Sequence, residues 1–178
     1  MREIKNVKER DNSTNKMFYF FLLIGMIPFW IILSVYLNDP ASPVLKAIAA
    51  STENLPAIIS QSSPLLSKVM DVYCKSAPFL GIIWFVCSAK YIKQDIKKEK
   101  RLFIRVVLIF PIFYFVIFYV VLICNHELTT SSRAIKMVSG NEYLLLIFYS
   151  GLHSFMLLLT YILLAIPFLT YRVFKKGR

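Results

Sequence analysis

The chain has 178 residues, of which 57% are apolar and 17% are charged, against about 25% charged in a typical soluble domain. Its 21 Lys and Arg and 10 Asp and Glu give a formal net charge of +11, and its mean hydropathy is +0.61. A soluble domain of this length has too little interior to bury so much apolar surface, and disordered chains are poor in apolar residues. The composition therefore indicates an integral membrane protein and excludes a nucleic-acid binder despite the positive charge.

Three uncharged segments are long enough to cross a hydrocarbon core about 30 Å thick as helices. They are Met17–Leu37, Val106–Cys124 and Tyr143–Tyr171, and the first is too long for the apolar core of a signal peptide. A shorter segment, Ser76–Ala89, has lysines at both ends that can extend to the headgroups. We predict an all-α membrane protein with four transmembrane helices. An alternative has three, with the short segment re-entrant or interfacial.

Lys and Arg are divided unevenly between the connections. The two tails and the middle connection contain 16 of them, and the other two connections contain five. Because positive residues stay on the cytoplasmic side, both termini and the middle connection are expected to be cytoplasmic. The predicted single membrane domain is divided into tail 1–16, span 17–37, outer loop 38–75, span 76–92, basic loop 93–105, span 106–124, outer loop 125–142, span 143–171 and tail 172–178.

The first outer loop is too long to be a simple link. Ser63 and Pro64 form a typical helix start, and apolar residues then recur at helical spacing. We expect an amphipathic helix that lies on the outer surface and bends into the bilayer at Pro78. The loop serves either to recognise something that arrives from outside or to cap the bundle. The polar face of the expected helix consists of Ser67, Lys68, Asp71 and Lys75.

Little in the chain supports catalysis or metal binding. Cys74, Cys87 and Cys124 lack metal-ligand spacing, and we expect free thiols, although a disulfide between the first and the last is an open alternative. His126 and Glu127 are explained as well by an exposed interfacial pair as by an acid–base pair. The sequence contains no Ser/His/Asp order and no glycine-rich phosphate loop, so we expect no enzymatic activity and no cofactor.

His153 is the one ionisable residue that falls well inside a predicted span. Such residues are functional candidates, but a neutral imidazole that bonds a neighbouring helix is the favoured interpretation. Two pairs of small residues, four positions apart, allow close helix approach: Ala77 with Gly81, and Ser150 with Ser154. Each pair serves either contact within the bundle or contact with an incoming partner helix.

Three stretches of the sequence resemble the colicin A immunity protein family. They are STENLP at Ser51–Pro56, KVMDVYCKSAPFL at Lys68–Leu80 and ELTT at Glu127–Thr130 followed by Arg133. The resemblance extends over the whole chain, and the thirteen-residue stretch is the most specific part of it. After Thr130 the chain has two serines, at 131 and 132, where the family has Ala-Gly, a difference that we associate with a different cognate toxin.

The resemblance implies bacteriocin immunity. A member of this family is a multi-pass protein of the bacterial inner membrane that binds the pore-forming domain of its cognate colicin, a helical hairpin in the membrane, and prevents channel opening. It implies no cofactor, nucleic acid or small-molecule substrate. The alternative is a small membrane transporter or an accessory subunit of a transport complex. The candidate recognition or outer-cap residues are Glu53, Asn54, Asp71, Lys75, Glu127, Thr129, Thr130 and Arg133, and the candidate intramembrane contacts are Ala77, Gly81, Ser150, His153 and Ser154.

Overall fold

The computed structural model describes residues 2–92, 100–130 and 133–176. Most of the predicted basic loop, the two serines at 131 and 132 and the last two residues lie outside this part of the chain. Four helical segments are long and apolar enough to cross a membrane, which confirms the predicted all-α membrane fold with four spans. These segments are Lys16–Asn38, Pro64–Ser88, Arg105–Ile123 and Glu142–Arg172.

The spans continue beyond these limits and are joined by shorter elements. In chain order the elements are α1 (Arg2–Asn38), α2 (Pro43–Ser51), β1 (Ile58–Ile59), α3 (Pro64–Cys74), α4 (Ala77–Ser88), α5 (Lys100–Phe118), the π-helical turn η1 (Tyr119–Ile123), β2 (His126–Glu127), α6 (Arg133–Ser139) and α7 (Glu142–Lys176).

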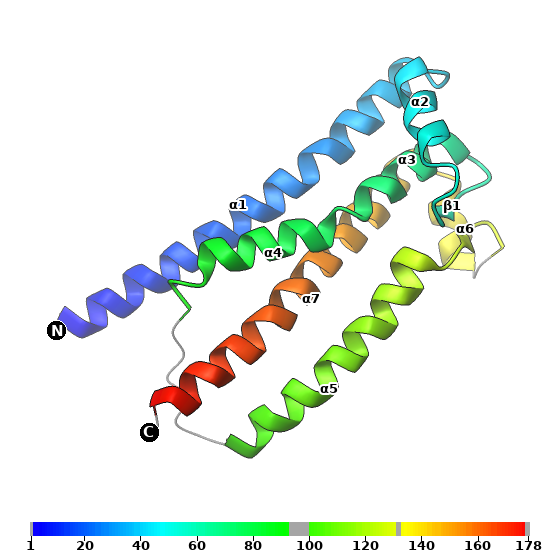
Figure 1. The fold of residues 1–178 in the computed structure, drawn as a ribbon. Coiled ribbons are helices and arrows are strands. Elements are labelled where there is room, and N and C mark those ends of the chain that lie inside the picture. The colour runs from blue at the N-terminus through cyan, green and yellow to red at the C-terminus, as the bar shows by residue number, and fades with distance from the viewer. Residues whose placement is uncertain (1, 93–99, 131–132, 177–178) are drawn as a thin grey trace.

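The long helices run side by side, and α7 is the central one (Figure 1). Helices α1, α3, α4, α5 and α6 all pack against α7, and α4 makes the most extensive contact with it. Both chain ends lie at one end of the bundle, whereas α2, β1 and α6 gather at the other end (Figure 1). The second end is called the outer end below, following the orientation expected from the distribution of Lys and Arg.

The second span consists of two helices, α3 and α4, with a break at Lys75 and Ser76. The Ser76 hydroxyl and backbone N–H both donate to the Tyr73 carbonyl, which closes the last turn of α3, and Pro78 then lies in the first turn of α4. Helix α3 continues along the bundle beside α1 and α7, so the expectation that it lies on the outer surface is wrong (Figure 1). The reason is burial: its polar residues Ser67, Lys68 and Asp71 are buried, as are Leu66, Val69 and Met70.

The core has an outer and an inner cluster. The outer cluster joins α1, α3, β1 and α7 around the fully buried side chains of Phe29 and Tyr149. The inner cluster joins α4, α5 and α7 around Trp84, Tyr114 and Met156. Lipid tails are as apolar as these side chains, so close packing and hydrogen bonds between helices hold such a bundle together.

Candidate functional site

The two outer connections are joined to each other by a short parallel bridge. Ile58 and Ile59 of β1 pair with His126 and Glu127 of β2. The Leu128 N–H donates to the Ile59 carbonyl at 2.9 Å, and the Asn125 side-chain oxygen accepts from the Ala57 N–H at 2.8 Å. Residues almost 70 positions apart in the sequence therefore lie together at the outer end of the bundle. We call the two outer connections, from α2 to β1 and from β2 to α6, the outer cap.

Buried hydroxyl groups attach this cap to the ends of α6 and α7. The Tyr149 hydroxyl donates to the Ile58 carbonyl at 2.7 Å, and the Ser60 hydroxyl donates to the Ser139 carbonyl at 2.8 Å. The Ser67 hydroxyl accepts from the Ser60 N–H at 3.0 Å. Each bond satisfies a backbone group that otherwise would be buried without a partner, so these hydroxyls stabilise the position of β1.

Three charged residues on one side of α3 hold the segment that precedes β1. The Lys68 ammonium donates to the Leu55 carbonyl at 2.7 Å. The Lys75 ammonium donates to the Pro56 carbonyl and pairs with the Asp71 carboxylate, which is only 1% exposed. A buried carboxylate is costly unless it is paired, and Lys75 supplies that pair one helical turn away. Asp71 and Lys75 thus act here as internal supports.

The turn before this anchored segment faces outward. Glu53, Asn54 and Leu55 are exposed, and the Leu55 N–H donates to the Thr52 carbonyl at 3.0 Å. The Thr52 hydroxyl donates to the Ile48 carbonyl in the last turn of α2. The turn is therefore presented at the surface while hydrogen bonds hold both of its ends.

The second outer connection forms a turn that is stabilised by its own hydroxyl groups. The Thr129 hydroxyl donates to the Glu127 carboxylate at 2.5 Å, and the Thr130 hydroxyl donates to the Glu127 carbonyl at 3.2 Å. Leu128 between them is buried in the outer core cluster. Thr130 and the nearby Arg133 are exposed. Within the Glu-Leu-Thr-Thr stretch, Leu128 therefore anchors the turn to the core and Thr130 faces outward.

Ala77 and Gly81 lie between α4 and α7. Both are buried, and a Cβ atom added to Gly81 would lie 2.9 Å from the Leu157 carbonyl oxygen and 2.9 Å from the Thr160 Cβ. The Thr160 hydroxyl in turn is 3.0 Å from the hydroxyl of Tyr114 in α5. This pair of small residues therefore allows α4 to approach α7 closely within the bundle.

His153 is enclosed between α1, α3 and α7. Its ring is 1% exposed, stacks on Tyr73 with centroids 5.2 Å apart, and meets the edge of Phe29. A Cβ atom at Gly25 would lie 2.7 Å from this ring, so α1 approaches it through glycine. Among the described residues no partner bonds the imidazole Nε2, so this nitrogen lacks the expected hydrogen bond to a neighbouring helix.

Ser150 and Ser154 differ from the other small pair in that neither is fully buried. The Ser150 hydroxyl donates to the Ile147 carbonyl, and the Ser154 hydroxyl donates to the Ser150 carbonyl of the same helix. A Cβ atom at the neighbouring Gly151 would meet nothing within 4 Å. This part of α7 faces away from the described helices.

The three cysteines are free thiols in the structure, which agrees with the favoured interpretation. Cys74 is buried and contacts the Tyr149 carbonyl, Cys87 is exposed, and Cys124 is partly exposed. Among the described residues no group of His, Cys, Asp and Glu is arranged to hold a metal ion.

The profile of the colicin immunity protein family matches residues 41–178, which include the whole cap and three of the four spans. The chain belongs to the colicin immunity protein family. Its biological role is bacteriocin immunity.

Two curated relatives match the chain almost from end to end. The colicin-A immunity protein of Citrobacter freundii is 40% identical over 94% of this chain and 95% of its own length. The colicin-B immunity protein of Escherichia coli is 34% identical over 94% of this chain and 96% of its own length. No solved structure is significantly similar to the chain. Both relatives bear the names of colicins, in agreement with the resemblance stated from the outer-loop residues.

Several structural residues of the cap were missed by sequence reasoning. Tyr149, Ser60 and Asn125 hold backbone groups that are distant in the chain, and no local pattern marks them. Lys68 was placed on the polar face of the expected helix but not among the candidate cap residues, although it lies three positions before Asp71 and seven before Lys75 on the same side.

Proposed function

We propose that the protein protects a colicin-producing cell by binding the pore-forming domain of one cognate colicin in the inner membrane before its channel opens. Membership of the colicin immunity protein family carries this proposal. The protein then acts as a binding partner and not as an enzyme. The apolar helices and the excess of Lys and Arg at the end with both termini support a multi-pass protein of the cytoplasmic membrane.

The outer cap is the part of this protein that a toxin arriving from the periplasm meets first. Its exposed polar residues include Glu53 and Asn54 on one turn and Thr130 and Arg133 at the other. We assign recognition to these four residues. The supporting role falls to Asp71, Lys75, Glu127 and Thr129, which bond groups within the cap.

A polar cap suits discrimination between related toxins. A rejected toxin places an unmatched charge or an unpaired polar group against the cap, and each such mismatch costs free energy. The bundle below provides the apolar surface on which membrane-inserted helices associate through close packing and hydrogen bonds. The cap therefore selects the toxin, and the spans hold it.

Expression of the chain alone in a colicin-sensitive strain tests the proposal. Membrane potential is followed after purified pore-forming colicins, including colicins A and B, are added one at a time. We expect the potential to persist with one colicin and to collapse with most others. A colicin that kills through a nuclease domain is the control and should kill equally with or without the chain. Unchanged depolarisation by every pore-forming colicin of this group would refute the proposed function.

The proposed orientation has a separate test. Reporter fusions at Gln61 and Lys136 should report the periplasm, and fusions at Lys97 and Arg178 should report the cytoplasm. A reversed result at either pair would contradict the orientation, and the cap could then not be the face that meets the toxin.

A further inference from the structure

The end of the bundle opposite the outer cap, which we call the inner end, holds the excess positive charge of the chain. The two tails and the middle connection meet there and contain 16 Lys and Arg but only five Asp and Glu. The two outer connections contain five residues of each sign. Such an excess orients a membrane protein, and it also attracts the anionic lipid headgroups of the cytoplasmic leaflet. A defined lipid site requires, in addition, that charged side chains from more than one element are held together.

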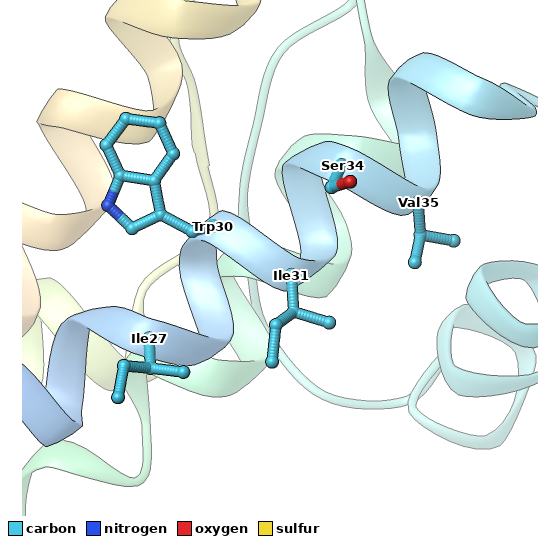
Figure 2. A pocket seen from close by; sticks show the side chains of 5 residues that line it. All are labelled: Ile27, Trp30, Ile31, Ser34 and Val35. Atoms are coloured by element: carbon cyan, nitrogen blue, oxygen red, sulfur yellow. The ribbon is translucent and has the colours of Figure 1, made fainter.

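The sides of the bundle offer a lipid mainly apolar contacts. On the outer half of α1, for example, an open depression is lined by Ile27, Trp30, Ile31, Ser34 and Val35 (Figure 2). In this view the three aliphatic side chains project from one side of the helix. Lipid tails are as apolar as such a surface and can cover it whatever headgroup they carry. A preference for one class of lipid must therefore come from polar groups at the ends of the helices.

The second and fourth spans are joined to each other where they end at the inner end. Their apolar segments stop at Ser88 and Arg172. After Ser88 the chain makes a turn, in which the N–H groups of Tyr91 and Ile92 donate to the Ser88 carbonyl at 2.8 and 3.3 Å. The Arg172 guanidinium of α7 donates from Nη1 to the Ile92 carbonyl at 2.9 Å. The end of the fourth span and the turn after α4 therefore lie together at the level of the headgroups.

Arg172 is held in place by an aromatic ring as well as by this hydrogen bond. Its guanidinium carbon lies 4.3 Å from the centroid of the Phe168 ring, one turn earlier in α7. The Phe168 ring in turn meets Phe85 of α4 edge to face, with centroids 5.5 Å apart. A guanidinium group has five N–H donors, and in the described part of the chain Arg172 makes one hydrogen bond. Because the residue is exposed, its remaining donors can bind a group from outside the protein.

Lys90 adds a second positive charge to this place. It lies in the turn after α4, two residues before the carbonyl that Arg172 bonds, and it is exposed. Among the described residues neither Lys90 nor Arg172 takes part in an ion pair. The sequence contains no Asp or Glu in residues 72–94 and 143–178, which include both of these span ends. Two neighbouring cations thus lack a carboxylate on their own segments, and the exposed Tyr91 and Tyr171 beside them are typical of the membrane interface.

We propose that Arg172 and Lys90 form a binding site for the phosphate group of an anionic lipid in the cytoplasmic leaflet. The planar guanidinium matches phosphate oxygens in a bidentate way, and the lysine ammonium acts as a further point charge. Exposed apolar residues of α4, among them Ile82, Ile83 and Val86, give the acyl chains a surface to cover. The bound headgroup stabilises the contact between α7 and the turn after α4. This site lies at the opposite end of the bundle from the outer cap and does not depend on the proposed recognition of a toxin.

Native mass spectrometry of the purified full chain in a neutral detergent tests the site. Phosphatidylglycerol, phosphatidylcholine and inorganic phosphate are titrated one at a time. We expect phosphatidylglycerol to bind more tightly than phosphatidylcholine, whose headgroup has no net charge, and inorganic phosphate not to compete with it. One Lys or Arg near the headgroups contributes roughly fivefold to the affinity for anionic lipid. Lys90→Gln should therefore lower the affinity for phosphatidylglycerol roughly fivefold, and Lys90→Gln with Arg172→Gln roughly 25-fold.

Lys46→Gln with Lys136→Gln is the matched control, because both lysines are exposed at the outer end and the pair removes the same charge. This control should bind phosphatidylglycerol as tightly as the unmodified chain. Lys90→Gln should also unfold at the unmodified temperature in detergent without lipid, which separates lipid binding from a structural role.

Three results would overturn the proposal: equal losses of affinity in the two double variants, equal affinity of the unmodified chain for the two lipids, or displacement of phosphatidylglycerol by inorganic phosphate. No colicin enters the measurement, so its failure would leave the proposed function untouched.

Discussion

The outer cap contains two groups of charged and polar residues that differ in exposure. Lys68 and Asp71 on α3 are buried, Lys75 directly after α3 is partly exposed, and each bonds a backbone or side-chain group of the cap. Glu53 and Asn54, on the turn held by that network, are exposed. The comparison teaches that one loop divides its polar residues between support and presentation. Substitutions in the first group should act on stability, and substitutions in the second should act on toxin recognition alone.

The largest expected effect comes from Asp71→Ala. This change removes the buried Asp71 carboxylate from its pair with the partly exposed Lys75 ammonium, and breaking an ion pair with a buried member costs up to about 3–5 kcal/mol. We expect the protein to disappear from the membrane fraction or to unfold at a much lower temperature in detergent. Glu53→Ala removes an exposed carboxylate from the same loop and is the control. Equal thermal stability of the two variants would show that the network does not support the cap.

Gly81→Ala extends the comparison into the membrane. The added methyl group would meet the Leu157 carbonyl and the Thr160 side chain, and overpacking of this kind costs about 1–3 kcal/mol. Gly151→Ala is the control, because its methyl group would meet nothing and alanine favours the helix by about 1 kcal/mol. Thermal unfolding in detergent should place the first variant below the unmodified chain and the second at or above it. The reverse order would contradict the packing of α4 on α7.

Tyr149→Phe tests one long-range attachment of the cap. Loss of the hydroxyl leaves the Ile58 carbonyl buried without a partner, at a cost of about 1–3 kcal/mol. Protease cleavage in the segment 52–60 should become faster, because β1 is then less firmly held. Tyr143→Phe removes an exposed hydroxyl at the start of the same helix and should leave the cleavage rate unchanged. Identical rates for both variants would exclude this role of Tyr149.

The smallest effect on stability is expected for the exposed turn. Glu53→Gln combined with Asn54→Ala should change the free energy of unfolding by less than about 0.5 kcal/mol, since both residues are exposed. If the turn recognises the toxin, protection should weaken or change its specificity while the amount of protein stays the same. The dose of colicin that kills half of the cells measures this. If the protein level falls together with protection, Glu53 and Asn54 contribute to stability and not to toxin recognition.

The amino-acid sequence by itself determined the fold class, the four spans and the family. These follow from local properties: the length of apolar segments, the charge of the connections, and short motifs in the outer loops. The start of α3 at Ser63 and Pro64 was likewise visible, because capping preferences act within a few residues.

Only the tertiary structure decided which candidates face inward. The sequence places Asp71 and Lys75 on the polar face of a surface helix, whereas in the fold Asp71 is buried and Lys75 bonds the Pro56 carbonyl just before β1. The position of β1 depends in turn on Asn125 and Tyr149, which are 68 and 91 residues away from the groups they bond. In the same way, the role of Gly81 is visible only in the fold, where its backbone lies close to the Leu157 carbonyl oxygen of α7. Burial in this protein is produced by contacts between segments that are distant in the chain, and no local pattern contains that information.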